Sequence, residues 1–331
     1  MRGEENVKFL FLLVALLVAS FAVAIGFGET SLSAAQYAQA FAHPGSAPGE
    51  ILWGLRAPRA AAAGLVGAQL GLAGAVMQGL LRNPLADPGV LGVSAFAALG
   101  AAAIIALGMA GPPGIVELAA MAGALIAGAI VAALAGYLRE PETLILFGVA
   151  LSAMGGALTA LIFNLSPSPV TTNEVMNWLL GSAAGRGWGD IAVALGPTVL
   201  GAGLSAYAAR GLTQLTLGEE TAALSGLPMA RLRAAAVAGA ALLTGAAVAM
   251  AGVIGFVGLA APHLVRGAVR DDPARTLAPS VLAGAILLIL ADLAARTIPS
   301  DEELKLGVVT ALIGAPLFAV LAWRAARSWR A

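Results

Sequence analysis

Cysteine is absent from the 331-residue sequence, so disulfides, thiolate nucleophiles and cysteine-ligated metal sites are excluded. Charge is scarce as well, since 11% of the residues are Asp, Glu, Lys or Arg, whereas a soluble domain carries about 25%. Such a chain cannot cover a water-facing surface. Its 60% hydrophobic content and mean hydropathy of +0.91 indicate a protein whose solvent is the bilayer. The 18 basic and 18 acidic residues balance, and we expect no nucleic-acid partner.

Groups that could supply energy or catalysis are also missing. Lysine occurs only as Lys8 and Lys305, and no G-x-x-x-x-G-K-[ST] loop is present to bind ATP. The apolar runs lack the buried acids and histidines of ion-coupled carriers, because Asp292 and Glu117 lie close to the ends of such runs. His263 has no acid or second histidine nearby, so we expect no metal site. The chain is therefore predicted to be neither an enzyme nor a cofactor carrier, and to take its energy from a partner.

Long apolar runs and small residues are abundant. A membrane helix needs about 20 mostly apolar residues, and the 42 glycines predict helices whose backbones approach closely in lipid. We expect one all-α polytopic domain over residues 1–331, with an uncleaved first span. The clear spans are predicted at 9–27, 60–81, 90–110, 118–138, 143–165, 191–209, 277–295 and 306–323.

The charge-free stretch 234–265 decides the total number of spans, because it is too long for one helix and too short for two full ones. Cytoplasmic loops accumulate Lys and Arg. If the stretch crosses twice, 13 basic residues lie on the cytoplasmic side and 5 outside, but one crossing makes the tally 9 against 9. We therefore expect ten spans, including a short one near 256–265, in the cytoplasmic (inner) membrane with both termini inside.

Three arginines stand near span ends on the predicted outer side. Pro58 favours a helix start between Arg56 and Arg59, so this start holds both cations at a defined place. Snorkelling to the membrane interface is an alternative use of these side chains. Arg296 follows Asp292 by four residues, a spacing that places an acid and a base on one helix face and favours an internal salt bridge.

The predicted cytoplasmic loop 210–233 contains a short helix. Gly218 can open it, Glu219 and Glu220 favour its N-terminal dipole, and Gly226 with a following proline ends it. An exposed helix of about two turns is unstable alone in water. Its small apolar face therefore predicts a covering surface, either a cytoplasmic partner subunit or the membrane.

These segments, in this order, resemble the permease family of ATP-binding-cassette (ABC) importers for iron-siderophores, haem and cobalamin, the type II importers. The resemblance covers nearly the whole chain, and the combination is far more specific than any one piece. The matching stretches are Leu55-Arg-Ala-Pro-Arg59, Gly74-Ala-Val-Met-Gln78, Asn83-Pro-Leu-Ala-Asp-Pro-Gly89, Leu91-Gly-Val-Ser94, Asn177-Trp-Leu-Leu-Gly181, Leu217-Gly-Glu219, Gly255-Phe-Val-Gly258, Pro262-His-Leu-Val-Arg266 and Gly307-Val-Val-Thr-Ala-Leu-Ile-Gly-Ala-Pro316.

The resemblance implies a homodimer of this chain on two ATPase subunits, which hold ATP and Mg. It also implies a periplasmic substrate-binding protein whose glutamates meet Arg56, Arg59 and Arg296. The substrate would be a metal chelate, namely an iron-siderophore, haem or cobalamin, with the choice left open. The residues that match the family's coupling helix are Gly218, Glu219, Glu220, Ala222, Leu224, Gly226 and Leu227.

The resemblance further implies a path between the two copies, lined mainly by the fifth span. Residues matched to this path are Ser152, Met154, Gly155 and Gly156, and those matched to the inner gate are Glu140, Pro141, Glu142 and Thr143. This loop differs from relatives with small hydroxyl residues there. ATP binding would bias a two-state equilibrium of the halves. The competing hypotheses are an ion-coupled secondary transporter and a membrane scaffold or receptor.

Overall fold

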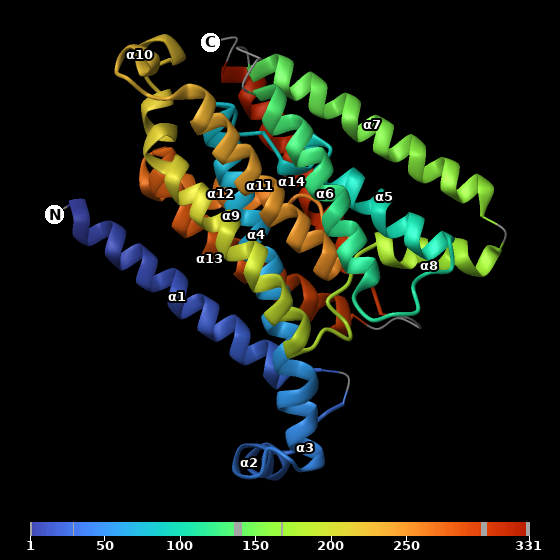
Figure 1. Ribbon diagram of the computed structural model, residues 1–331. Coiled ribbons are helices and arrows are strands. Elements are labelled where there is room, and N and C mark those ends of the chain that lie inside the picture. Colours follow the sequence, from blue (N-terminus) through green and yellow to red (C-terminus); the bar gives the residue numbers. More distant parts are fainter. Residues whose placement is uncertain (1, 29, 136–140, 167, 299–302, 329–331) are drawn as a thin grey trace.

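The computed structural model describes residues 2–28, 30–135, 141–166, 168–298 and 303–328, and every element in these ranges is helical (Figure 1). The predicted all-α fold is therefore confirmed for this part of the chain. The helices are α1 (Arg2–Gly26), α2 (Ala34–Ala42), α3 (Ala47–Gly49), η1 (Glu50–Arg56), α4 (Ala57–Leu80), η2 (Pro88–Leu91), α5 (Val93–Ala106), α6 (Ile115–Ala135), α7 (Pro141–Leu165), α8 (Pro169–Leu179), α9 (Trp188–Leu215), α10 (Glu219–Leu224), α11 (Met229–Ala251), α12 (Val257–Arg266), η3 (Gly267–Val269), α13 (Pro273–Thr297) and α14 (Leu306–Ser328).

Seven helical segments of the described chain are long and apolar enough to cross a bilayer, and two further apolar helices, 93–106 and 306–320, are shorter. Helix α12 lies where the short span near 256–265 was predicted. The predicted ten spans therefore agree with the helices observed. Helix α12 is only ten residues long and is surrounded by protein, which is where short or broken helices are tolerated in membranes.

The stretch 234–265 reverses direction, as the charge tally predicted. Helix α11 ends at a glycine, Gly252, whose φ of +71° is unfavourable for other residues, and whose added Cβ would lie 2.3 Å from the Trp178 carbonyl oxygen. Helix α12 then returns to the end of the bundle where α11 began. There the guanidinium of Arg266 donates to Gln78 near the end of α4. The stretch thus crosses twice.

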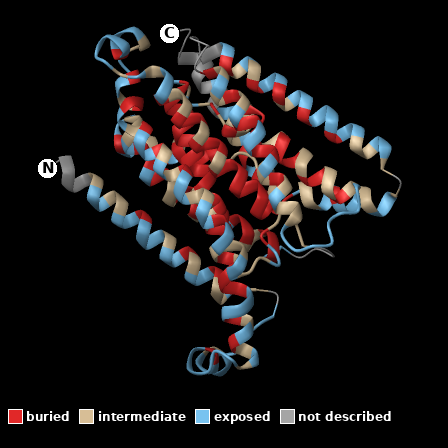
Figure 2. Cartoon of the chain, viewed as in Figure 1, coloured by how far each residue is buried: buried red, intermediate tan, exposed pale blue. Residues whose placement is uncertain are grey.

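Helix α4 forms the centre of the bundle and is buried along most of its length (Figure 2). It packs against α9, α11, α12 and α13. Small residues make this possible, since a Cβ on Gly67 would lie 2.1 Å from the Gly284 carbonyl oxygen and one on Gly74 would lie 1.8 Å from that of Gly258. The predicted close approach of helix backbones is therefore present where α4 meets α12 and α13.

The bundle has two distinct ends. Helix α10 projects from one end, and α2 with α3 projects from the other (Figure 1). The first helix, α1, contacts η3 near the α10 end and η1 near the α2 end, so it runs the length of the molecule. Helices α1 and α7 lie on the outside and expose much of their surface (Figure 2).

Candidate functional site

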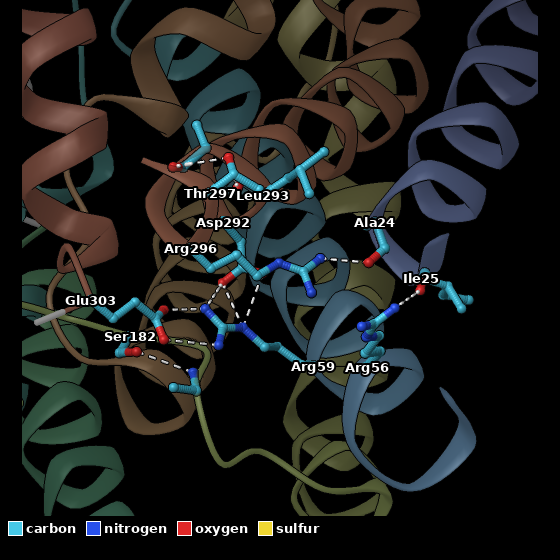
Figure 3. Close-up of polar contacts among 12 residues, drawn as sticks. Ala24, Ile25, Arg56, Arg59, Ser182, Asp292, Leu293, Arg296, Thr297 and Glu303 are labelled. Atoms are coloured by element: carbon cyan, nitrogen blue, oxygen red, sulfur yellow. Dashed lines mark hydrogen bonds and ion pairs between the residues drawn. The ribbon is translucent and has the colours of Figure 1, made fainter. Parts of the chain in front are cut away.

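The three predicted docking arginines come together at the end of the bundle that carries α2. Arg56 ends η1, Arg59 lies in the first turn of α4, and Arg296 lies in the last turn of α13 (Figure 3). Helix α4 continues directly from η1 through Pro58, at a position where the missing N–H of proline costs little. The sequence therefore places these cations on two neighbouring helices that meet at this end.

Arg59 lies between two carboxylates. Its Nη2 is 2.8 Å from Oδ1 of Asp292, its Nε donates to the same oxygen at 3.0 Å, and its Nη1 donates to Oε2 of Glu303 at 3.0 Å. The Asp292 side chain is 2% exposed and that of Glu303 is 25% exposed. A charge this deeply placed is stable only when it is paired and hydrogen-bonded. This network joins α4, α13 and the segment before α14.

Arg56 and Arg296 bind the end of α1. The Arg56 guanidinium donates to the Ile25 carbonyl and to the Tyr37 hydroxyl, both at 3.1 Å. Arg296 donates to the Ala24 carbonyl at 2.6 Å. The last carbonyls of a helix have no partner within it, and cations are favourable at that end. The two arginines therefore hold the C-terminal end of α1 against the bundle.

The arginines thus have internal partners in the single chain. Arg56 is 6% exposed and Arg296 is 8% exposed, and Nε of Arg296 lies 3.5 Å from Oδ2 of Asp292. The internal salt bridge expected from the four-residue spacing is present. The end of α1 and the segment after it cover the Arg56 side chain. The docking role of the three residues stays a prediction.

The predicted coupling helix forms at the opposite end as α10, which ends earlier than the sequence suggested. Gly218 precedes it with φ of +97°, and Gly226 follows it with φ of +86°. Glu219 forms an ion pair with Arg233 of α11. Ala222 is fully buried, whereas Leu224 at the tip is 90% exposed. Glu220 is exposed, and Leu227 is half-buried beneath the helix.

Helix α7 divides the predicted path residues between two faces. Ser152 donates to the carbonyls of Gly89 and Val90, and an added Cβ on Gly155 would meet α5 at 3.0 Å. Met154 is 46% exposed, and a Cβ on Gly156 would meet nothing within 4 Å. Only the second pair lies on the free face of α7.

The predicted gate lies partly outside the described residues. Glu140 falls there, and α7 begins at Pro141, followed by Glu142. Thr143 is exposed on the first turn of α7. The role of these residues in gating stays a prediction.

No group of three His, Asp or Glu side chains that could hold a metal occurs within the described ranges. The polar clusters at the two ends consist of charge pairs and helix-end contacts. Such an arrangement binds and positions charged groups. Sequence reasoning missed Glu303 and the α1 carbonyls as partners of the arginines, because they lie between 31 and 272 residues away along the chain.

Comparisons with known proteins identify a family for this chain. A model described as the FecCD transport family matches residues 16–324. The chain is 39% identical over 286 residues to the ABC transporter permease protein YvrB of Bacillus subtilis (strain 168), covering 85% of this chain and 80% of that one. It is 41% identical over 286 residues to the vitamin B12 import system permease protein BtuC of Salmonella typhimurium, covering 85% and 86%.

A solved structure is similar over almost the full length. It is an inward-facing conformation of a metal-chelate type ABC transporter, and it superposes with a TM-score of 0.84 at 32% sequence identity. The match covers 96% of this chain and 99% of the other.

Proposed function

Because this chain belongs to the FecCD transport family and is a membrane permease subunit of an ABC importer, we propose that two copies of it form a channel that imports an iron-siderophore, haem or cobalamin. Two ATPase subunits, which hold ATP and Mg, drive the import from the cytoplasm, and a periplasmic binding protein delivers the substrate. The chain breaks no bond in the substrate. It lies in the cytoplasmic (inner) membrane with both termini inside.

The observation that carries this proposal is the exposed tip of α10. A six-residue helix is too short to be stable alone in water. Here the buried Ala222 and the ion pair of Glu219 with Arg233 anchor one side of it, and Leu224 projects from the other. A leucine that is 90% exposed on an anchored helix suits a groove on a partner subunit. We assign that groove to the ATPase subunit.

The substrate path runs between the two copies, along the free face of α7. This helix is long, lies on the outside of the bundle, and exposes Met154 and Gly156 (Figure 1). Few polar groups line this face, so the path binds substrate weakly and selectivity resides in the binding protein. Closure of the ATPase subunits moves α10, and the two halves then rock between inward and outward access.

The binding protein docks at the arginine end. Arg59 is the most accessible of the three cations, with a side chain that is 15% exposed. Its second partner, Glu303, lies on the connecting segment before α14 and is exchangeable for an incoming glutamate. Such an exchange keeps two carboxylates beside Arg59. It also moves the segment that carries Glu303 and leads into α14. Charge-paired contacts of this kind set partner choice and association rate.

The relatives support the proposed substrate class. Those named BtuC import vitamin B12, and the similar solved structure is of a metal-chelate type transporter. Both cargoes are bulky metal chelates, in keeping with a wide path between two copies. We therefore propose a chelate of this group as the substrate.

The proposal is tested by reconstituting the chain with its ATPase subunits and binding protein in vesicles. Uptake is expected to require ATP and to continue when the ion gradient is collapsed. Leu224→Asp should abolish uptake and release the ATPase subunits, whereas Leu224→Met, which keeps the apolar tip, should retain both. Uptake that persists without the ATPase subunits and stops when the gradient is collapsed would identify an ion-coupled carrier instead.

A further inference from the structure

An apolar groove of about 690 Å³ opens between α6, α9 and α11. Its walls are formed by side chains such as Met121, Leu125, Val193, Leu200 and Leu242. These three helices pack side by side, with α11 between the other two (Figure 1). Neither α7 nor α14 contributes to the lining, so the groove is separate from the free face of α7 that lines the proposed path.

A cluster of three charges stands at one end of the groove. Nη1 of Arg186 lies 2.8 Å from Oε1 of Glu117 and 3.9 Å from Oδ1 of Asp190. Glu117 is in the first turn of α6 and Asp190 is in the first turn of α9. Trp188, beside this cluster, is 52% exposed. Tryptophan and charges at helix ends are typical of the membrane–water interface.

The groove extends from this cluster into the depth of one leaflet. Its lining on α9 runs from Asp190 to Leu200, which is about 15 Å at the rise of an α-helix. The hydrocarbon core of a bilayer is about 30 Å thick, so one leaflet is about 15 Å deep. The polar end and the apolar length therefore match a lipid standing in its own leaflet.

We propose that this groove is a binding site for a phospholipid with an amine-bearing zwitterionic headgroup, such as phosphatidylethanolamine. One acyl chain fills the groove between α6 and α9. The two carboxylates exceed the single guanidinium, so the ammonium group of the lipid meets Asp190 and Glu117 while its phosphate meets Arg186. An anionic headgroup without an amine would face a net negative charge, and it binds more weakly.

Gly196 provides a direct test, because it lines the groove and a Cβ added there meets nothing within 4 Å. Gly203 is its matched control, since it lies on the same helix, is equally open and is outside the groove. We would purify the full chain in mild detergent, add phosphatidylethanolamine or phosphatidylglycerol, and count bound lipids by native mass spectrometry.

The unmodified chain and Gly203→Leu should bind phosphatidylethanolamine at least about tenfold more tightly than phosphatidylglycerol, a difference of about 1.4 kcal/mol. Gly196→Leu should lose the bound lipid. Asp190→Asn, which keeps the acceptor for the Gly187 N–H, should retain lipid and lose the preference for the amine. Equal binding of both lipids, or equal retention by the two leucine variants, overturns the proposal. A dimer that Gly196→Leu dissociates would assign the groove to a second copy and overturns it as well.

Discussion

At the scale of single residues, the arginine cluster illustrates what sequence spacing can and cannot predict. The pairing of Asp292 with Arg296 follows from four-residue spacing within one helix. The pairing of Arg59 does not follow from spacing, because its partners Asp292 and Glu303 lie 233 and 244 residues further along the chain. Only the packing of α4 against α13 brings these charges together. Nor does the spacing predict that Arg56 and Arg296 donate to the last carbonyls of α1.

This cluster predicts unequal effects for its two acids. Asp292→Asn leaves Arg59 and Arg296 without a buried counter-charge, so we expect the free energy of unfolding to fall by about 3 kcal/mol. Glu303→Gln removes a more accessible charge and should cost about 1 kcal/mol. Unfolding of the detergent-solubilised chain by SDS titration measures both. Equal losses would show that the two acids support Arg59 to the same degree.

Asp87, in the turn between α4 and α5, predicts a dependence of stability on pH. Burial raises the pKa of its carboxyl above the ordinary value of 3.8, and the hydrogen bond from the Gly89 N–H opposes that rise. Because its folded-state pKa is raised, the protonated carboxyl stabilises the fold below pH 3.8. This contribution is lost as the pH rises through the raised pKa.

Asp87→Asn keeps the acceptor for Gly89 and removes the titrating group. In the unmodified chain, the titration of Asp87 lowers the free energy of unfolding as the pH rises. The Asp87→Asn variant should lack this contribution. Stability curves of the two proteins measured from acidic to neutral pH give the comparison. Parallel curves would mean that the Asp87 carboxyl has the same pKa in the folded and unfolded chains.

At the scale of elements, the charge tally predicted that the stretch 234–265 reverses, although it did not give the residue. The reversal needs Gly252 in a left-handed conformation and Phe256, with φ of +67°, just before α12. A positive φ is uncommon for a bulky residue such as Phe256, so the sequence predicted a short span near 256–265 but not this backbone conformation at its start. The limits of α10 and the division of α7 into a packed and a free face also depend on neighbouring helices.

The reversal can be tested at Gly252, which combines a positive φ with a close backbone approach. Gly252→Ala places a Cβ at a φ of +71° and 2.3 Å from the Trp178 carbonyl oxygen, so we expect a loss of at least about 2 kcal/mol of stability. Gly255→Ala is the control, because its Cβ would meet nothing within 4 Å. The SDS titration distinguishes them, and a similar midpoint for both would argue against the described turn.

At the scale of the whole molecule, composition was enough to predict the membrane fold. Low charge, long apolar runs and the arginine tally gave an all-α bundle with ten crossings and two unlike ends. The groove between α6, α9 and α11 was beyond sequence reasoning, because its lining comes from three helices separated along the chain. The family resemblance named four path residues on α7, but it did not separate Met154 and Gly156 on the free face from Ser152 and Gly155 on the packed one.

The absence of cysteine makes the orientation of the two ends directly measurable. Leu224→Cys and Phe41→Cys would each introduce the only thiol, at side chains that are 90% and 64% exposed. With a membrane-impermeant maleimide, Phe41→Cys should react in intact spheroplasts, and Leu224→Cys should react only after permeabilisation. Reaction of both from the same side would refute the odd number of crossings predicted between residues 41 and 224 and the proposed direction of import.

The hold of Arg296 on the Ala24 carbonyl also sets an order of events during synthesis. The two residues are separated by 272 positions, so at about 5–20 residues per second a ribosome needs about 15–50 s to make the second after the first. Throughout that interval the end of the first helix lacks this contact. A nascent chain stalled before residue 296 would therefore hold that end through Arg56 but not through Arg296.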